Sequence, residues 1–277
     1  MYHDNKPIKK FFYKFDKLFM STNESLDTMN PTAIIQVRTG SSRLPGKILN
    51  KLNGITVLEC FFEQLKYSKS LKDVVIATTL NSKDEIIVDF AKENHIEFFR
   101  GSETDVLDRF YNCAKKFAIY DIVRMTPDCP LIDPNVVDKV INFYKNNKFD
   151  FVSNTLQRTF PYGNDVEVFS FTALETAWKN AKKPSEREHV TPFIYNNPNL
   201  FSIAQIKNSE TLTRFHWTLD RKEDLMFIRA IYQKISRKPI FIEDILEILK
   251  KNPEFLKINK NTVSDEGYQK SLRGDVA

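Results

Sequence analysis

The chain has 277 residues, of which 42% are hydrophobic and 28% are charged. These proportions are typical of a globular protein, and they exclude a largely disordered chain or one built of membrane-spanning segments. Lysine and arginine together number 41 against 36 acidic residues, an excess that suits an anionic ligand but is too small for a protein that coats nucleic acid.

Residues 1–30 differ in character from the rest of the chain. Between residues 8 and 20, apolar side chains recur at helical spacing and lysines occupy mainly the other face. The pattern predicts a basic amphipathic helix, and residues 21–30 follow it as a polar linker. Lysines interrupt every apolar run, so the segment is not a secretory signal, and we expect no membrane-spanning segment anywhere. The helix could rest on an anionic membrane surface, on its own domain or on a partner.

From residue 32 onward, apolar runs rich in β-branched residues alternate with helical patterns. This order predicts an α/β fold in which helices cover both faces of a mainly parallel sheet. The expected strands are 33–37, 74–78, 97–99 and 122–125, and the expected helices between them are 56–68, 83–94 and 105–117.

The second half continues without an internal repeat or a low-complexity linker, so we expect one domain over residues 31–277. A strand pattern covers residues 166–170, and a short apolar run covers residues 150–154. The expected helices are 135–146, 171–181, 188–195, 222–236 and 242–251.

A basic loop follows the first expected strand directly. It combines two glycines, three hydroxyl side chains, two arginines and a lysine between Arg38 and Lys47. Ligands of open α/β sheets bind outside the carboxyl ends of the strands, where this loop must lie. Its small residues allow backbone N–H groups to approach phosphate oxygens, and its cations can neutralise their charge. A solvated basic turn is the simpler alternative, but a triphosphate fits the loop well.

The basic loop matches no standard dinucleotide or P-loop pattern, because both glycine spacings are absent. Adenylate cofactors and hydride transfer therefore lose support. The residues expected to bind the nucleotide are Arg38, Gly40, Ser41, Ser42, Arg43 and Lys47.

A second polar site follows the expected strand 122–125. Asp128 lies between Pro127 and Pro130, where its carboxylate is well placed to bind a hard cation. Asp133 precedes Pro134 at the start of an expected helix, and we interpret it as an N-terminal cap.

Asp220 ends the run His216-Trp217-Thr218-Leu219-Asp220 before another expected helix. Alone it is typical of a helix cap. Paired with Asp128, it becomes a candidate metal ligand. Nucleotidyl transfer needs such a pair, because a divalent cation neutralises charge that develops as an acceptor oxygen displaces pyrophosphate.

Cys60, Cys113 and Cys129 form no C-x-x-C pair, and with four scattered histidines they show no metal-site spacing. Reduced thiols in a cytoplasmic protein are the simplest interpretation.

The segment 33–47 resembles the nucleotide-binding loop of the cytidylyltransferases that activate sialic acid-like and ketodeoxyoctonate-like sugar acids, most of all their spore coat polysaccharide branch. The resemblance covers about residues 32–272. Its further motifs lie at 100–109, 128–133, 161–168, 185–191, 217–220 and 267–272.

The resemblance implies a Rossmann-like nucleotidyltransferase αβα sandwich that transfers CMP from CTP to a small anionic acceptor and releases pyrophosphate. It implies Mg²⁺ bound by Asp128 and Asp220, with Asp128, Arg43 and Lys47 as the catalytic residues. Such enzymes are commonly homodimers formed through an arm after the first half of the sheet. The resemblance also places Ala77, Thr78 and Ser102 beside the cytidine, and Tyr162, Asp165, Glu167 and His216 beside the acceptor.

Two residues depart from the family pattern, and both bear on the acceptor more than on CTP. Pro127 stands where a glycine is expected, which removes a backbone N–H, and His216 stands where the family often has arginine.

A nucleotide-sugar glycosyltransferase is the alternative, because it would use a similar sheet and a metal-bound nucleotide. Such enzymes usually carry an Asp-x-Asp pair, whereas Asp128 is followed by Cys129 and Pro130. A binding protein that lost catalysis is a third alternative, but all of the expected polar groups are present.

Overall fold

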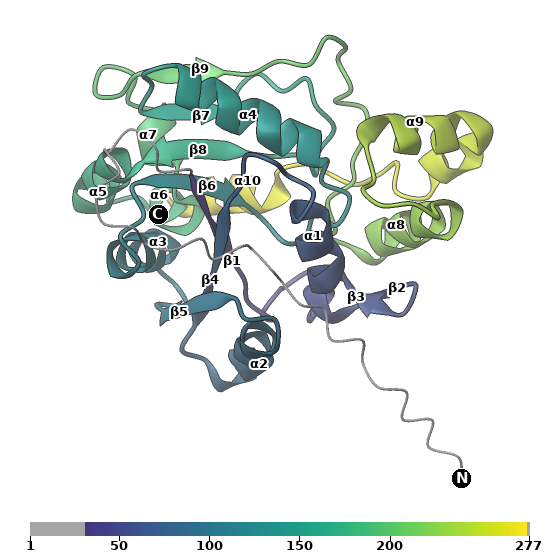
Figure 1. The fold of residues 1–277 in the computed structure, drawn as a ribbon, viewed down its shortest axis with the longest axis horizontal. Coiled ribbons are helices and arrows are strands. Elements are labelled where there is room, and N and C mark those ends of the chain that lie inside the picture. Colours follow the sequence, from purple (N-terminus) through teal and green to yellow (C-terminus); the bar gives the residue numbers. More distant parts are fainter. Residues whose placement is uncertain (1–30, 276–277) are drawn as a thin grey trace.

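The computed structural model describes residues 31–275, so the helix expected over residues 8–20 and the linker after it lie outside the described residues. The described part has one seven-stranded sheet and a separate two-stranded hairpin (Figure 1). Within residues 31–275, no helix has both the length and the apolar character that a membrane crossing requires.

The first half of the sheet consists of the four strands that the sequence predicts. They form the parallel order β5-β4-β1-β6, and Ile34 of β1 lies between Val75 of β4 and Arg124 of β6. The chain moves from β1 outward to β4 and β5 and then returns to the other side of β1, so a crevice opens between the carboxyl ends of β1 and β6. The bounds are β1 (Thr32–Gln36), β4 (Asp73–Thr79), β5 (Glu97–Gly101) and β6 (Asp121–Met125).

The second half of the sheet adds three strands beyond β6. The predicted strand at residues 166–170 is β8 (Glu167–Ser170), which runs antiparallel to both of its neighbours, β6 and β7 (Phe151–Ser153). The edge strand β9 (Ile203–Gln205) pairs with β7 in parallel, and the sequence analysis did not predict it. The sheet is therefore mainly parallel, as expected.

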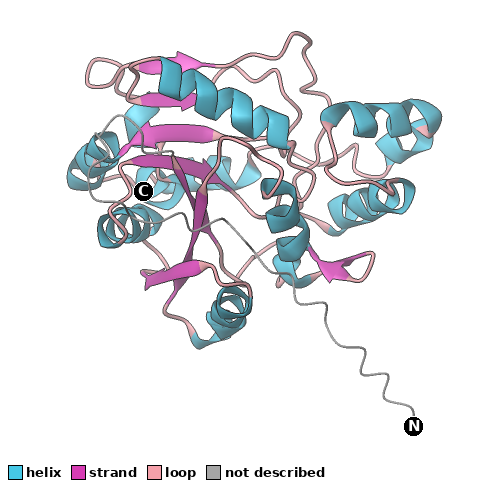
Figure 2. Cartoon of the chain, viewed as in Figure 1, coloured by secondary structure: helices cyan, strands magenta, loops and turns pink. Residues whose placement is uncertain are grey.

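Helices cover both faces of the sheet, which confirms the three-layer prediction (Figure 2). Consecutive residues of β1 point to opposite faces. Ile35 packs with α1 (Val57–Leu65), α2 (Glu85–Glu93) and α4 (Pro134–Asn146), whereas Ile34 packs with α3 (Val106–Lys116) and α5 (Phe171–Asn180). The sheet therefore has one hydrophobic core on each face, and helices from different parts of the chain cover each core.

Capping side chains explain where two of these helices begin. Thr56 and Glu59 form a reciprocal capping box at the start of α1. Asp133 accepts a hydrogen bond from the Asn135 N–H at the start of α4, which confirms its interpretation as a cap. Asp133 also accepts a hydrogen bond from the Ile242 N–H, and burial raises the pKa of its carboxyl to about 6.

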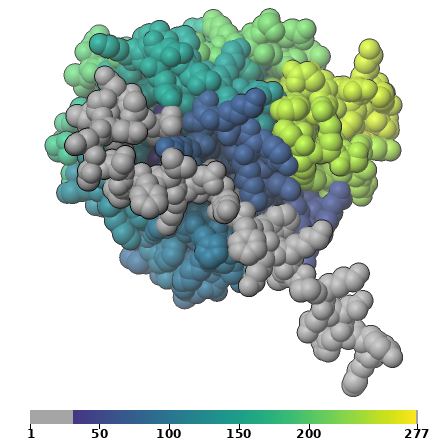
Figure 3. Space-filling model, in the orientation of Figure 1, coloured from purple at the N-terminus to yellow at the C-terminus, as the bar shows by residue number. Residues whose placement is uncertain are grey.

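The C-terminal segment packs against the first half of the domain (Figure 3). Its helices α8 (Lys222–Lys234) and α9 (Ile242–Lys251) match the prediction, and their apolar side chains join the core beside α1. The elements that the sequence analysis did not predict are the hairpin β2 (Lys51–Leu52) and β3 (Ile55–Thr56), the 3-10 helices at Lys47–Leu49, Ser82–Asp84 and Pro253–Lys257, and α10 (Glu266–Gly274).

The prediction of a single helix over residues 188–195 is wrong. The structure has two short helices, α6 (Pro184–His189) and α7 (Pro192–Tyr195). Val190 lies between them with φ of 72°, a left-handed conformation that ends α6. Pro192 then starts α7, because proline suits the first helical position.

Gly163 allows two distant segments to approach closely, and this predicts a substitution effect. Its φ is 99°, and an added Cβ would lie 2.9 Å from the carbonyl carbon of Trp217. Gly54, in the hairpin, has a similar φ of 92° but open space around it. The positive φ alone costs an alanine roughly 1–2 kcal/mol, and the clash adds to that cost at Gly163 only.

We therefore expect Gly163→Ala to lower the free energy of unfolding more than the matched control Gly54→Ala. Urea denaturation of the two variants measures both values. Equal losses would show that the backbone of Trp217 does not constrain Gly163.

Candidate active site

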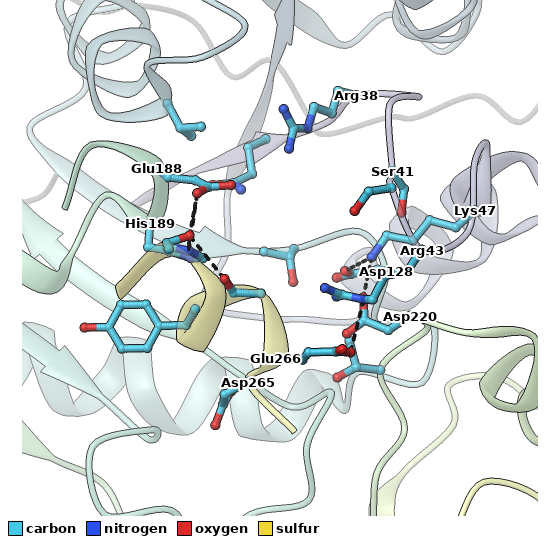
Figure 4. A pocket seen from close by; sticks show the side chains of 18 of the residues that line it. Arg38, Ser41, Arg43, Lys47, Asp128, Glu188, His189, Asp220, Asp265 and Glu266 are labelled. Atoms are coloured by element: carbon cyan, nitrogen blue, oxygen red, sulfur yellow. Dashed lines mark hydrogen bonds and ion pairs between the residues drawn. The ribbon is translucent and has the colours of Figure 1, made fainter. Parts of the chain in front are cut away.

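A cavity of about 570 Å³ opens at the carboxyl ends of β1 and β6. The basic loop lines one side of it, and the segment 126–129, which follows β6, lines its floor. Residues 162–165, 216–220, 184–189 and 265–274 complete the lining, so the cavity gathers segments from the whole described chain (Figure 4). It lies at the switch point of the sheet, where the fold predicts a ligand site.

The basic loop is held by side chains that do not face the ligand space. Thr39 donates from its N–H and its hydroxyl to Asp84 Oδ1, over 2.8 and 2.7 Å. Leu44 is buried in the core, and Gly46 turns the chain at φ 67° into the 3-10 helix that begins at Lys47. The backbone is therefore anchored on both sides of the cations, which orients Arg43 and Lys47 toward the cavity.

Lys47 joins the two predicted metal ligands. Its Nζ lies 2.5 Å from Asp128 Oδ2 and 3.0 Å from Asp220 Oδ1, and Arg43 lies 2.6 Å from the same Asp220 oxygen (Figure 4). Burial alone would lower the pKa of Lys47, but the charges of Asp128 and Asp220 outweigh it and hold the pKa above its ordinary value. Asp220 has a lowered pKa because Lys47 and Arg43 overcome the opposing effect of burial. Lys47 and Asp220 thus stabilise one another in their charged forms.

Backbone hydrogen bonds bring Asp128 and Asp220 to the same place. The Leu219 N–H donates to the Asp128 carbonyl over 2.8 Å, and the Trp217 N–H donates to the Tyr162 carbonyl over 2.9 Å. Asp220 is not the cap of α8. Arg221 holds that position, and buried Asp224 accepts hydrogen bonds from the N–H groups of Asp220 and Arg221. The Asp220 carboxylate is therefore free to face the cavity.

The pair of carboxylates fits a magnesium ion. Both touch one ammonium group, so they are close enough to share a single cation. Magnesium in nucleotide sites takes one or two carboxylates from the protein and its other ligands from water and phosphate. Within residues 31–275 there is no cluster of three or more histidine, cysteine or acidic side chains that could hold a metal alone. A cation bound by these two carboxylates would therefore take its other ligands from water or from the phosphates of a nucleotide.

A second cavity of about 360 Å³ adjoins the first and shares five lining residues with it, which are Thr126, Asp165, His189, Asp265 and Tyr268. Its arginines are already paired. Arg124 lies 2.5 Å from Glu167, and Arg158 forms a two-point contact with Asp165. Many of the other polar side chains in this cavity carry hydroxyl groups, which come from Thr126, Thr155, Thr191, Tyr195 and Tyr268. The Thr191 hydroxyl donates to Glu167, and the Thr155 hydroxyl is hydrogen-bonded to Ser153.

Most of the predicted site residues line the larger cavity. Tyr162, Asp165 and His216 do so beside the two aspartates, and Glu167 faces the second cavity instead. Both Glu167 oxygens are engaged, one by Arg124 and one by the Thr191 hydroxyl. The predicted nucleotide-binding residues in the lining are Arg38, Gly40, Ser41, Ser42, Arg43 and Lys47.

Three predicted residues are absent from the lining of the two cavities. Ala77 and Thr78 are fully buried in β4, and the Ser102 hydroxyl accepts a hydrogen bond from the Asp105 N–H. The Thr78 hydroxyl has no hydrogen-bond partner within the described chain. Their contact with the cytidine stays a prediction.

The sequence analysis missed the contribution of α6 and α10 to this site. Residues of both helices line the larger cavity, including Glu188, His189, Glu266, Tyr268 and Lys270. The motifs 185–191 and 267–272 belong to the family resemblance but received no functional assignment. These two motifs do not directly follow any expected core strand. Their presence in the resemblance was therefore the signal that a further part of the site lay there.

His189 predicts how stability depends on pH. Burial, reinforced by the charge of Arg124 and opposed by Glu188 and Asp275, lowers its pKa to about 4. An unfolded histidine titrates near 6.5. The unfolded chain therefore binds the proton first, and the native state loses roughly 1–3 kcal/mol as the pH falls from 6.5 to 4.

His189→Gln should remove this part of the acid destabilisation, since glutamine can still meet the Ser271 hydroxyl. His95→Asn, at an exposed histidine outside the cavity, is the matched control and should retain it. Urea unfolding at pH 7 and pH 4.5 measures the difference. A pH dependence that His189→Gln leaves intact would contradict the assignment.

Comparisons with known proteins agree with this geometry. Residues 32–262 match the family described as Cytidylyltransferase. An uncharacterized protein of Methanocaldococcus jannaschii is 42% identical over 247 residues, which is 88% of this chain and 98% of that protein. The spore coat polysaccharide biosynthesis protein SpsF of Bacillus subtilis is 31% identical over 80% of this chain and 94% of its own.

Two further proteins extend the similarity. The 8-amino-3,8-dideoxy-manno-octulosonate cytidylyltransferase of Shewanella pealeana is 30% identical over 46% of this chain and 53% of its own. The solved structure of a cytidylyltransferase from Leptospira borgpetersenii superimposes with a TM-score of 0.79 at 34% identity, and the match covers 85% of this chain and 98% of that one. The cationic loop and the two aspartates lie at the switch point of the sheet, and the family match covers residues 32–262. The chain therefore belongs to the cytidylyltransferase family.

Proposed function

We propose that this chain is a magnesium-dependent cytidylyltransferase that transfers CMP from CTP to a sugar acid or a related anionic acceptor and releases pyrophosphate. One observation carries the proposal. Arg43, Lys47, Asp128 and Asp220 meet in one cavity, so cations for phosphate oxygens and carboxylates for a divalent ion share a site.

In the proposed reaction, an oxygen of the acceptor attacks the α-phosphorus of CTP. A new oxygen–phosphorus bond forms, the bond between the α-phosphorus and the bridging oxygen breaks, and that oxygen leaves with pyrophosphate. Arg43 and Lys47 would contact the phosphate oxygens, where their charge offsets the negative charge of the leaving group. Asp128 and Asp220 would hold a magnesium ion, which supplies further neutralisation of the phosphates.

The charge of the cavity supports a requirement for a divalent cation. Its lining includes six carboxylates but only five lysine and arginine side chains, and its two histidines are His189 and His216. Burial keeps His189 neutral. A polyanionic triphosphate would enter a lining without net positive charge, and a divalent ion at the two aspartates would remove the repulsion.

The acceptor would lie toward the second cavity, beside Tyr162, Asp165 and His216. The hydroxyl-rich lining of that cavity suits a polyhydroxylated molecule. The sugar-acid class is supported by two relatives, the spore coat polysaccharide protein SpsF and the octulosonate cytidylyltransferase. The His216 Nδ1 lies 3.3 Å from the Ser264 hydroxyl, and this residue stands where an arginine is common in the family, so it bears on which acceptor is selected.

The proposal predicts that Asp128→Ala stops turnover without unfolding the protein. Lys47 keeps Asp220 as a partner in this variant, so no buried charge loses its last contact. We expect turnover to fall by about a hundredfold or more, because part of the charge stabilisation in the transition state is lost. Pyrophosphate release with CTP, magnesium and a panel of sugar acids measures it.

Asp89→Ala is the matched control, because Asp89 is an exposed aspartate on α2 outside both cavities. It should keep wild-type turnover and the same melting temperature. Near-normal pyrophosphate release by Asp128→Ala would contradict the assignment. Consumption of a nucleotide sugar but not of CTP by the wild type would favour a glycosyltransferase instead.

We also propose that the enzyme is a homodimer and that residues 8–20 contact a membrane surface or a partner. Light scattering of the full chain should give twice the mass of one chain. Deletion of residues 1–29 should change either this mass or liposome binding. A monomeric full chain would refute the dimer, and a deletion without effect on either property would refute the contact.

A further inference from the structure

The two cations that are expected to bind phosphate are not available in this structure. Lys47 contacts Asp128 and Asp220, and Arg43 contacts Asp220 over 2.6 Å and Glu266 over 3.8 Å. Three carboxylates therefore surround two cations. A magnesium ion could take the place of Lys47 and Arg43 at the two aspartates. Glu266 would still lie beside Arg43 after that exchange. Glu266 thus places a negative charge beside the guanidinium that a phosphate would need, although Arg43 Nε forms no hydrogen bond within the described residues.

Other cations of the same cavity lack an acidic partner. Within residues 31–275, Arg38, Arg109 and Lys270 line the cavity and form no ion pair. Arg38 and Arg109 line the same cavity, and burial, followed by the charge of Arg38, lowers the pKa of Arg109 to about 10. Lys270 is separate from them in the chain, because α10 carries it.

Four of the residues that α10 presents to the cavity follow one helical stripe, and Glu266 and Tyr268 lie beside that stripe. Gly267, Lys270, Ser271 and Gly274 line the cavity, at the i, i+3, i+4 and i+7 spacing of a single face. An added Cβ on Gly267 would lie 3.5 Å from Arg43 Nη1, so the first turn of α10 lies against Arg43. Lys270 follows Gly267 on this face by about 4.5 Å along the helix. Its flexible four-carbon stem can bring Nζ beside Arg43.

α10 is held by polar contacts that a ligand could exchange. No residue of the helix is buried. Glu266 contacts Arg221 over 2.9 Å as well as Arg43, and Ser271 hydrogen-bonds to Glu188 and His189 (Figure 4). Tyr268 also packs edge-on against His189, and Asp275, just after the helix, accepts hydrogen bonds from Ser185. Because no residue of the helix is buried, it is held by surface contacts of this kind, which open locally more readily than core packing does.

We propose that α10 takes part in nucleotide binding: Lys270 binds the β- and γ-phosphates of CTP, and the negative charge of Glu266 beside Arg43 competes with those phosphates. The inference rests on the proposed function of the same cavity. It makes Lys270 a further substrate-binding residue and Glu266 a competitor of the substrate. The two residues belong to one helix and affect CTP binding in opposite directions.

Titration calorimetry with CTP and magnesium on the full chain tests both parts. Lys270→Met should weaken CTP binding by about fivefold to tenfold, since one charge-assisted contact to phosphate is lost. Lys270→Arg keeps the positive charge and should therefore keep most of the wild-type affinity for CTP. Glu266→Gln should tighten CTP binding by about threefold. CMP lacks the outer phosphates, so its dissociation constant should change less than twofold in either variant.

Arg273→Met is the matched control, because Arg273 is an exposed cation of the same helix that does not line the cavity. It should bind CTP as the wild type does, and melting temperatures verify that every variant is folded. Wild-type CTP affinity in Lys270→Met, equal losses for CTP and CMP, or no tightening in Glu266→Gln would overturn the inference. Failure of the wild type itself to bind CTP would overturn the proposed function as well.

Discussion

The contact of one ammonium group with two carboxylates is the interaction on which the site depends. Lys47 follows β1, Asp128 follows β6, and Asp220 comes from a segment that returns past both strands. Neighbouring parallel strands bring the first two together, and the pairing of Tyr162 with the 215–217 segment brings the third. Since both aspartates share one cation, the same arrangement is ready to share a metal ion.

Charge balance then connects the site with its surroundings. The basic loop looks strongly cationic in the sequence, yet its inner cations are neutralised by acidic residues from other segments. This balance supports the proposal that a nucleotide enters together with a divalent ion or displaces some of these carboxylates. The second cavity has its arginines paired as well, which supports the proposal that it recognises a molecule rich in hydroxyl groups.

Local patterns account for what the sequence could predict. The alternation of strand and helix patterns predicted the three layers. The loop from Arg38 to Lys47 predicted the edge of the sheet at which the cavity lies. The break at Val190 was missed, because a residue with positive φ depends on contacts that no local pattern reveals. Asp220 alone resembled a helix cap, and only its pairing with Asp128 indicated a metal ligand; in the structure Asp224 takes the capping hydrogen bonds instead. α10 was missed for a similar reason, since it has no apolar stripe that periodicity could reveal.

A crystal structure of the full chain with CTP and magnesium tests the central claim most directly. The account predicts one metal ion bound by Asp128 and Asp220, with phosphate oxygens within hydrogen-bonding distance of Arg43 and Lys47. A nucleotide bound outside this cavity, or phosphates whose metal ion touches neither aspartate, would contradict it.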